Sequence, residues 1–196
     1  MQEKTQIVLG IDPGSKSSGI VIFQEDILLR GDNLLNEDLF SLIDNYSWID
    51  GLYNLFIVYE DIRPYTSRFN MDTIDTCKVI GKLEHVLKQQ RTPFVAVTRN
   101  EVKSFIFNTY NSIVVPEIEK KILKKGKVNK DGKALKPSFQ YVDDRIVKKA
   151  MKFHWGIETP KPGKSDSRGI KTHVWQALGA VTWFYNKEAL ILKGAS

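Results

Sequence analysis

The stretch QIVLGIDPGSKSSGIVIF, residues 6–23, contains two apolar runs on either side of a polar segment. Residues 6–11 are mostly β-branched and apolar, and residues 19–23 form a second run of the same kind. Such runs are typical of strands, and segment 12–18 between them is rich in residues that form turns. This pattern predicts a hairpin or an opening pair of strands.

Strands and helices alternate along the rest of the chain. The run LFIVY at residues 55–59 is apolar throughout, which predicts a buried strand, and residues 93–97 predict another. Apolar residues at helical spacing predict helices around residues 39–43 and over 71–88, 100–107, 143–153 and 170–186. Helices interleaved with buried strands favour an α/β sandwich.

The length and composition are those of one packed globular domain. A chain of 196 residues with 42% hydrophobic residues is long enough for an ordinary α/β domain, so we expect a single domain over residues 1–196. The excess of 29 Lys and Arg over 23 Asp and Glu gives a net charge of +6, which is compatible with a polyanionic partner.

Cysteine content and hydropathy predict the cellular setting. Cys77 is the single cysteine, so it cannot form an internal disulfide, and the N-terminus lacks the pattern of a secretory signal. No apolar run approaches the roughly 20 residues needed to cross a bilayer. We therefore expect a cytoplasmic protein, of a bacterium or of a host cell, with no membrane partner.

A lysine-rich segment at about residues 117–137 is expected to form a basic loop. It carries eight lysines between Lys120 and Lys136, and it also contains Gly126, Gly132 and Pro137, which break regular structure. A solvated surface insertion and a flap that binds phosphates are equally good interpretations of this composition.

Two carboxylates stand where apolar strands end. Asp12 follows the first strand, and the glycines around it, at positions 10, 14 and 19, indicate a backbone that turns tightly or is approached closely. Glu60 directly follows the strand at residues 55–59. Alone, each acid is more often a cap or a turn residue than a functional one. Together at the ends of neighbouring buried strands they would repel one another unless a cation such as Mg²⁺ or Mn²⁺ neutralised them.

The opening segment VLGIDPGSKSSGIVIF resembles the first strand of the RuvC family of Holliday junction resolvases. The residues in matching places are Gly10, Asp12, Pro13, Gly14 and Gly19. The resemblance continues through Glu60, the helix end LKQQ, the strand FVAV and the segment RNEVKSFIF, which is similar to the family's Arg-x-x-Val-Lys helix. It implies an α/β, RNase H-like fold with a mixed central β-sheet flanked by α-helices.

The family completes its site with acidic or histidine residues spaced three apart at the start of the last helix, and HVWQALGAV is the matching stretch here. The resemblance places His173 on the first ligand position, but Gln176 stands where an Asp is usual. A neutral amide is a poor substitute for a carboxylate. Asp166, or less readily Asp143 or Asp144, could supply the missing charge. For the last two we prefer the interpretation of first-turn acids stabilised by the helix dipole.

The resemblance also implies DNA contacts. Lys103 matches a characteristic lysine of the family and would contact a phosphate in a catalytic role, beside Arg99 of the same segment. Tyr65 and Phe69 follow Glu60 in a loop where family members stack an aromatic on bases, which is worth roughly 1–3 kcal/mol. The basic segment adds Lys124, Lys125 and Lys127. A surface lysine and ordinary aromatic packing are the simpler alternatives.

The activity implied is that of a crossover junction endodeoxyribonuclease, which makes paired nicks in four-way or branched DNA and leaves 5′-phosphates. Asp12 would bridge two Mg²⁺ ions about 3.5–4 Å apart, with Glu60 and His173 as further ligands, and Mn²⁺ would be able to substitute. Two symmetric nicks imply a homodimer, and the helix at residues 71–88 is its expected interface.

Three alternatives stay open. A nuclease of the same fold could have relaxed specificity for flaps, forks or packaging DNA. A branched-DNA-binding protein with weakened catalysis is a second alternative, motivated by Gln176. An Asp-x-Gly turn also opens sugar kinase and actin-like ATPase domains, but those proteins need two such domains in a longer chain, so no nucleotide cofactor is expected.

Overall fold

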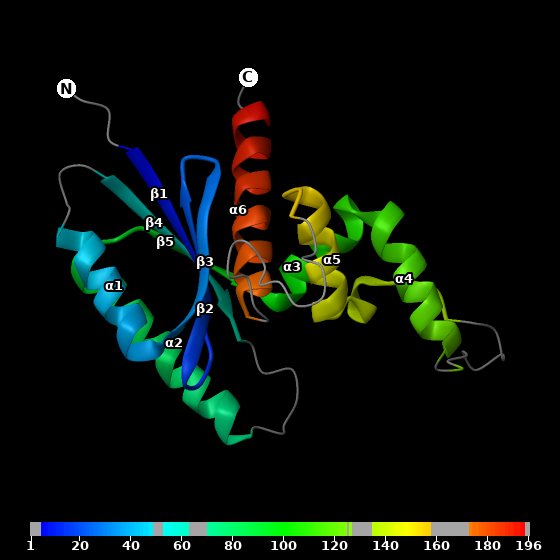
Figure 1. The fold of residues 1–196 in the computed structure, drawn as a ribbon, viewed down its shortest axis with the longest axis horizontal. Coiled ribbons are helices and arrows are strands. Elements are labelled where there is room, and N and C mark those ends of the chain that lie inside the picture. Colours follow the sequence, from blue (N-terminus) through cyan, green and yellow to red (C-terminus); the bar gives the residue numbers. More distant parts are fainter. Residues whose placement is uncertain are drawn as a thin grey trace, which may run out of the picture.

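A mixed β-sheet forms the centre of the molecule (Figure 1). The structure is a computed structural model and describes residues 5–48, 53–62, 70–124, 126, 135–157 and 173–194. The sheet has five strands in the order β3-β2-β1-β4-β5. Their bounds are β1 Thr5–Asp12, β2 Ser17–Gln24, β3 Ile27–Leu35, β4 Tyr53–Asp61 and β5 Phe94–Thr98.

The strand directions bring two acids to one edge of the sheet. Strand β1 pairs antiparallel with β2, and β2 with β3, whereas β1 with β4 and β4 with β5 are parallel. The last paired residues of β1 and β4 are Ile11 and Tyr59. Because parallel strands end at the same edge, Asp12 and Glu60, the next residues along each strand, lie side by side there.

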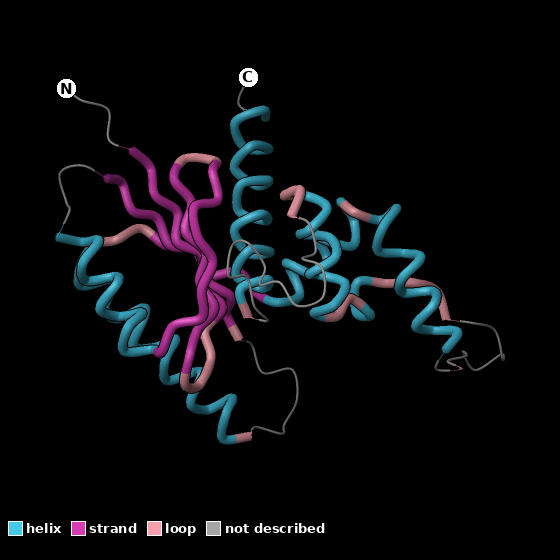
Figure 2. Tube along the Cα trace, in the orientation of Figure 1, coloured by secondary structure: helices cyan, strands magenta, loops and turns pink. Residues whose placement is uncertain are grey.

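Helices cover both faces of the sheet (Figures 1 and 2). One face carries α1 Asn36–Trp48 and α2 Met71–Gln90, and the other carries α6 Val174–Gly194 with α3 Arg99–Thr109 and α5 Asp144–His154 behind it. Helix α4 Asn111–Lys124 lies farthest from the sheet, and a short 3₁₀ turn, Phe139–Tyr141, precedes α5. Among the residues described, no helix combines the length and the apolar character required to span a bilayer.

The core is divided into two layers by the sheet. Along β1, Val8 packs into the cluster beneath α6 and Leu9 into the cluster beneath α1 and α2, because successive side chains of a strand point to opposite faces. Helix α6 lies directly on β1, where a Cβ at Gly10 would be 2.4 Å from Val181 Cγ2. The missing side chain of Gly10 therefore permits this close approach.

Most of the expected elements are present. The strands predicted at residues 6–11, 19–23, 55–59 and 93–97 form within a few residues of their expected bounds, as do the helices around 39–43 and over 71–88, 100–107 and 143–153. The last helix begins at Val174 and continues to Gly194, while residues 158–172 lie outside the described part. Strand β3 was not predicted, because its segment was expected only to be polar.

The prediction of a basic loop at about residues 117–137 is wrong for the first part of that segment, because residues 117–124 belong to α4. The buried residues Val114, Ile118 and Ile122 recur every fourth position, so they form one apolar helix face. Pro116 conceals this helix in the sequence, since proline is disfavoured inside helices. Residues 125 and 127–134 of the segment are not among those described.

Candidate active site

A pocket opens at the edge of the sheet where β1 and β4 end. Its wall comes from the turn after β1, the end of β4, the first turns of α2 and α3, and the residue that precedes α6. The lining residues are Asp12 to Ser17, Glu60, Ile62, Asp72, Thr76, Arg99 and His173. Three residues that sequence reasoning assigned to one site, far apart in the chain, thus share one pocket: Asp12, Glu60 and His173.

Asp12 and His173 are in direct contact. The Nδ1 atom of His173 lies 2.9 Å from Oδ2 of Asp12, which is only 7% exposed. Burial raises the pKa of Asp12, and the hydrogen bond with His173 opposes that rise. The same hydrogen bond raises the pKa of His173. The imidazole is therefore oriented by the carboxylate, with its other nitrogen left for a further partner.

Gly19 makes this contact sterically feasible. It is the β2 partner of Asp12 in the antiparallel register. A Cβ at Gly19 would lie 2.4 Å from the carbonyl carbon of His173 and 2.6 Å from its oxygen, closer than a real Cβ approaches backbone atoms. The start of α6 can rest against β2 beside Asp12 because this position has no side chain.

Asn36 fixes the turn that follows Asp12. Its Nδ2 donates to the carbonyl oxygens of Gly14, at 3.0 Å, and Ser15, at 3.2 Å, and its Oδ1 accepts from Ser18 Oγ at 2.8 Å. Asn36 begins α1, so the helix anchors the turn. Sequence reasoning missed this residue, because nothing in its local pattern shows that it reaches a turn about 20 positions earlier.

Glu60 is a buried acid whose negative charge is only partly compensated by the described residues. It is 3% exposed, and its Oε2 has no hydrogen-bond partner among the described residues. Burial, and then the charge of Asp12, raise the pKa of Glu60 to about 7, against the opposing charge of Arg99. Arg99 Nη1 lies 3.6 Å from Oε1 of Glu60, so the guanidinium is its nearest cation.

Helix α3 carries two basic residues, Arg99 and Lys103, in its first two turns. Thr98 caps the helix and forms a capping box with Glu101, which fixes Arg99 as the first helical residue. Lys103 stands one turn later on the same face, where burial lowers its pKa and the charges of Arg99, Asp144 and Glu60 also act on it. Of the two basic residues expected from the segment RNEVK, Arg99 lies beside Glu60 and lines the pocket, whereas Lys103 is not among the lining residues.

Asp143 and Asp144 begin α5 but face different partners. Asp143 caps the helix by accepting from Ile146 N at 3.1 Å, and it pairs with Lys121 at 2.8 Å. The interpretation as acids at the helix start is confirmed for both, because Asp143 is the N-cap and Asp144 lies in the first turn. Asp144 also forms an ion pair with Arg99 at the site, a contact that sequence reasoning did not predict.

Gln176 is buried one turn into α6, on the same helix face as His173, with 4% of its surface exposed. Its Nε2 has no hydrogen-bond partner among the described residues, and Gln176 is not among those that line the pocket. As a neutral amide it adds no negative charge there. The other ligand and base-stacking candidates and two of the lysines lie outside the described residues: Asp166, Tyr65, Phe69, Lys125 and Lys127.

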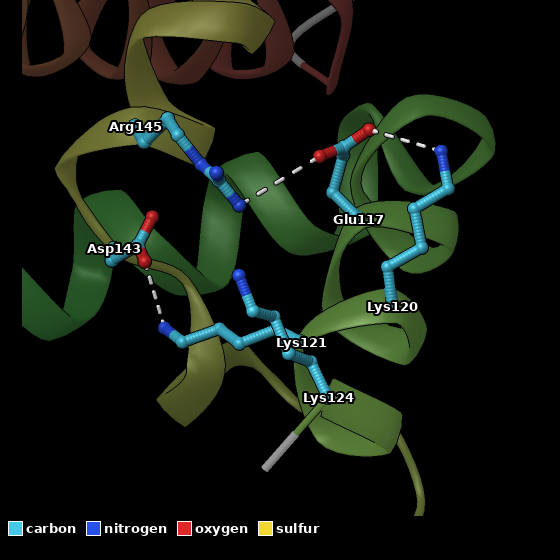
Figure 3. A pocket seen from close by; sticks show the side chains of 6 residues that line it. All are labelled: Glu117, Lys120, Lys121, Lys124, Asp143 and Arg145. Carbon is cyan, nitrogen blue, oxygen red and sulfur yellow. Dashed lines mark hydrogen bonds and ion pairs between the residues drawn. The ribbon is translucent and has the colours of Figure 1, made fainter.

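Lys124 lines a different hollow, between α4 and α5 (Figure 3). Lys121 pairs there with Asp143 and Lys120 with Glu117, whereas Lys124 has no acidic partner among the described residues. Arg145 completes the basic side of the hollow, which holds four cationic side chains and two acids. This surface carries a local excess of positive charge, separate from the pocket that contains Asp12.

The site residues suit a hard divalent cation in their chemistry. In the part of the chain that the structure describes, no three His, Cys, Asp or Glu side chains are gathered closely enough to hold a metal ion. However, two buried carboxylates that repel each other, one with an orphaned oxygen, and an adjacent imidazole form a donor set that Mg²⁺ and Mn²⁺ accept. Among the residues that the structure describes, Arg99 provides the nearest positive charge to Glu60.

Comparison with solved structures identifies the fold. No protein-family model and no curated protein sequence matches the chain. The structure of T. thermophilus RuvC in complex with a Holliday junction substrate matches with a TM-score of 0.50 at 14% identity, over 93% of this chain and 96% of that chain. A further Thermus thermophilus RuvC structure matches at 16% identity with a TM-score of 0.49 and the same coverage. The chain has a RuvC-like fold, which confirms the expected RNase H-like α/β class.

Proposed function

We propose that this chain of RuvC-like fold is a metal-dependent endonuclease that resolves Holliday junctions and related branched DNA by paired nicks leaving 5′-phosphates. The observation that carries the proposal is the convergence of Asp12, Glu60 and His173, from β1, β4 and the start of α6, in one pocket at the sheet edge. The matched RuvC structure is described as a complex with a Holliday junction substrate, which supports this substrate class.

Asp12, Glu60 and His173 would hold Mg²⁺, for which Mn²⁺ can substitute. A bound divalent cation supplies Lewis acidity to the scissile phosphate and to an attacking water. Asp12 contributes a carboxylate and also orients the imidazole of His173 through their hydrogen bond. Glu60 contributes the second carboxylate, and its burial keeps it away from competing water.

Arg99 and Lys103 would bind the DNA backbone next to the cut. Both belong to the first two turns of α3, Arg99 lies beside Glu60, and Lys103 has no ion-pair partner among the described residues. A lysine near carboxylates and without a dedicated partner is free to neutralise a phosphate as DNA enters. Lys103 would thereby hold the scissile or a neighbouring phosphate against the site.

Paired nicking requires two sites, so the enzyme would act as a homodimer with α2 at the interface. Helix α2 exposes Met71 and Ile74, whereas Asp72 and Thr76 in the same turns line the pocket. An interface on α2 would therefore place the two pockets at defined positions relative to the dimer axis, as two symmetric cuts require.

The variant Asp12→Asn tests this proposal. It keeps the size of the side chain but removes its charge, so nicking of a synthetic four-way junction should be abolished while binding of the junction persists. Initial rates on junction, flap and duplex oligonucleotides decide the substrate: a clear preference for the junction is expected. Equal rates on all three would favour the relaxed nuclease, and normal turnover by Asp12→Asn would exclude Asp12 from the chemistry.

A second candidate function is a branched-DNA-binding protein with weakened catalysis. The observations that favour it are the neutral Gln176 and the lack, within the described residues, of three grouped acidic, cysteine or histidine ligands. Mg²⁺-dependent nicking by the wild-type chain that is lost in Asp12→Asn would dispose of it. Junction binding without nicking at any Mg²⁺ or Mn²⁺ concentration would establish it instead.

A further inference from the structure

The guanidinium group of Arg99 lies between two carboxylates that belong to different elements. One of its nitrogens is 3.6 Å from Oε1 of Glu60 at the end of β4, and another forms an ion pair with Oδ1 of Asp144 in the first turn of α5. The two acids are consequently brought within reach of a single cationic group. Asp144 is not among the residues that line the pocket, but its partner Arg99 is.

The charge of Asp144 acts on every residue proposed for the chemistry. It opposes ionisation of Asp12 and Glu60 and favours the protonated forms of His173 and Lys103. Charges act on one another over several ångströms, so the contact that ties Asp144 to the site is its ion pair with Arg99. A second and independent observation is that Glu60 lines the pocket while its Oε2 is buried and has no partner among the described residues.

We propose that Asp144 is a further acidic residue of this site, acting with Asp12 and Glu60 on a divalent cation, and that Arg99 is the protein's own counter-ion between Glu60 and Asp144 until that cation binds. The inference rests on the proposed function. It assigns to α5 the negative charge that Gln176 of α6 does not bring. Asp144 is 57% exposed in its side chain, so it is free to change partners.

Asp143 provides a matched control within the same helix turn. Both acids stand at the start of α5, but Asp143 is bound to Lys121 and to the backbone of its own helix, whereas Asp144 is bound to Arg99. Asp143→Asn and Asp144→Asn each remove one negative charge from the same helix end. Asparagine caps helices about as well as aspartate, so both variants should fold.

The test is the binding of Mn²⁺ to the full chain without DNA, with free Mn²⁺ measured by electron paramagnetic resonance, so that cleavage does not enter. Asp144→Asn should weaken binding about tenfold or more, the size of effect usual for residues that support a metal site. Asp143→Asn should bind as the wild-type chain does, and Asp144→Glu, which keeps a carboxylate, should retain binding. Circular dichroism melts check the folding of each variant.

Arg99→Gln tests the second half of the inference. The variant removes the positive charge that competes with Mn²⁺, so it should bind Mn²⁺ more tightly than the wild-type chain does. The DNA contact that it also loses does not affect this measurement, which contains no DNA. If Asp144→Asn binds Mn²⁺ as tightly as Asp143→Asn, Asp144 has no part in the site. If Arg99→Gln binds Mn²⁺ no more tightly than the wild-type chain, Arg99 is not the competing counter-ion. If the wild-type chain itself binds no more Mn²⁺ than Asp12→Asn, the proposed cation site fails, and with it this inference.

Discussion

Among single residues, Gly19 decides the position of His173, because Gly19 has no side chain. The backbone of His173 occupies the space that a Cβ at Gly19 would need, at 2.4 Å from its carbonyl carbon. Rigid backbone cannot yield as the tip of a flexible side chain can. The hydrogen bond between Asp12 and His173 is thus secured by a neighbour that takes no part in it.

Gly19→Ala is expected to push the start of α6 away from β2. Overpacking of this kind lowers the free energy of unfolding by about 1–3 kcal/mol, and nicking should fall more than junction binding because His173 leaves Asp12. Gly81→Ala in α2 is the control, since nothing lies within 4 Å of a Cβ there. Urea unfolding and junction-nicking rates would measure both effects. Wild-type stability and activity in Gly19→Ala would contradict the packing account.

The local sequence predicted some residues of the site and not others. Asp12 and Glu60 were expected because each ends an apolar strand, and the parallel pairing of β1 with β4 brings them together. His173 came only from the resemblance to the RuvC family. Asp144 is the helix-start acid that was expected, but its contact with Arg99 was not expected, because that contact depends on how α3 and α5 pack, which no local pattern encodes.

At the scale of elements, periodicity was informative where a helix or strand has one continuous apolar face. It failed for β3, an edge strand whose exposed and buried residues do not alternate regularly. It failed again for α4. The apolar residues Val114, Ile118 and Ile122 are regularly spaced, but Pro116, a residue disfavoured inside helices, lies among them. The basic residues of α4 therefore lie on a rigid surface facing α5 and not in an irregular loop (Figure 3).

Lys124 on that surface is expected to bind a DNA phosphate at a distance from the cut. Lys124→Gln should weaken junction binding to a similar degree for all sequences, and the slope of log K against log salt should fall by about 1. Lys187→Gln on α6 is the control, because Lys187 lies over Trp183 toward the other end of that helix from His173. Fluorescence anisotropy at several salt concentrations gives both slopes. An unchanged slope for Lys124→Gln would remove α4 from the DNA interface.

At the scale of the whole molecule, the pocket and the exposed part of α2 lie close together. Asp72 and Thr76 line the pocket, while Ile74 between them is 39% exposed. A partner subunit that covers Ile74 would stand near the site without closing it. This arrangement suits an enzyme that must present two sites to one branched substrate.

Ile74→Glu is expected to convert a dimer to a monomer, because it places a charge within an apolar interface. Sedimentation velocity in the presence and absence of a four-way junction would measure the mass. Leu123→Glu, which alters an exposed leucine on α4, should leave the dimer intact. A wild-type chain that stays monomeric on the junction, or an Ile74→Glu variant that remains dimeric, would exclude α2 as the interface.

The function proposed for Asp12, Glu60 and His173 is that of a cation-dependent site that cuts branched DNA. Its most direct measurement is the nicking of a synthetic four-way junction by the chain after treatment with EDTA, with Mg²⁺ returned in steps and the cut positions and ends mapped on all strands. We expect no nicks without Mg²⁺ and, once Mg²⁺ is restored, paired nicks at symmetric positions with 5′-phosphate ends. Nicks that form equally well in EDTA, or a junction that stays intact in saturating Mg²⁺ and Mn²⁺, would contradict it.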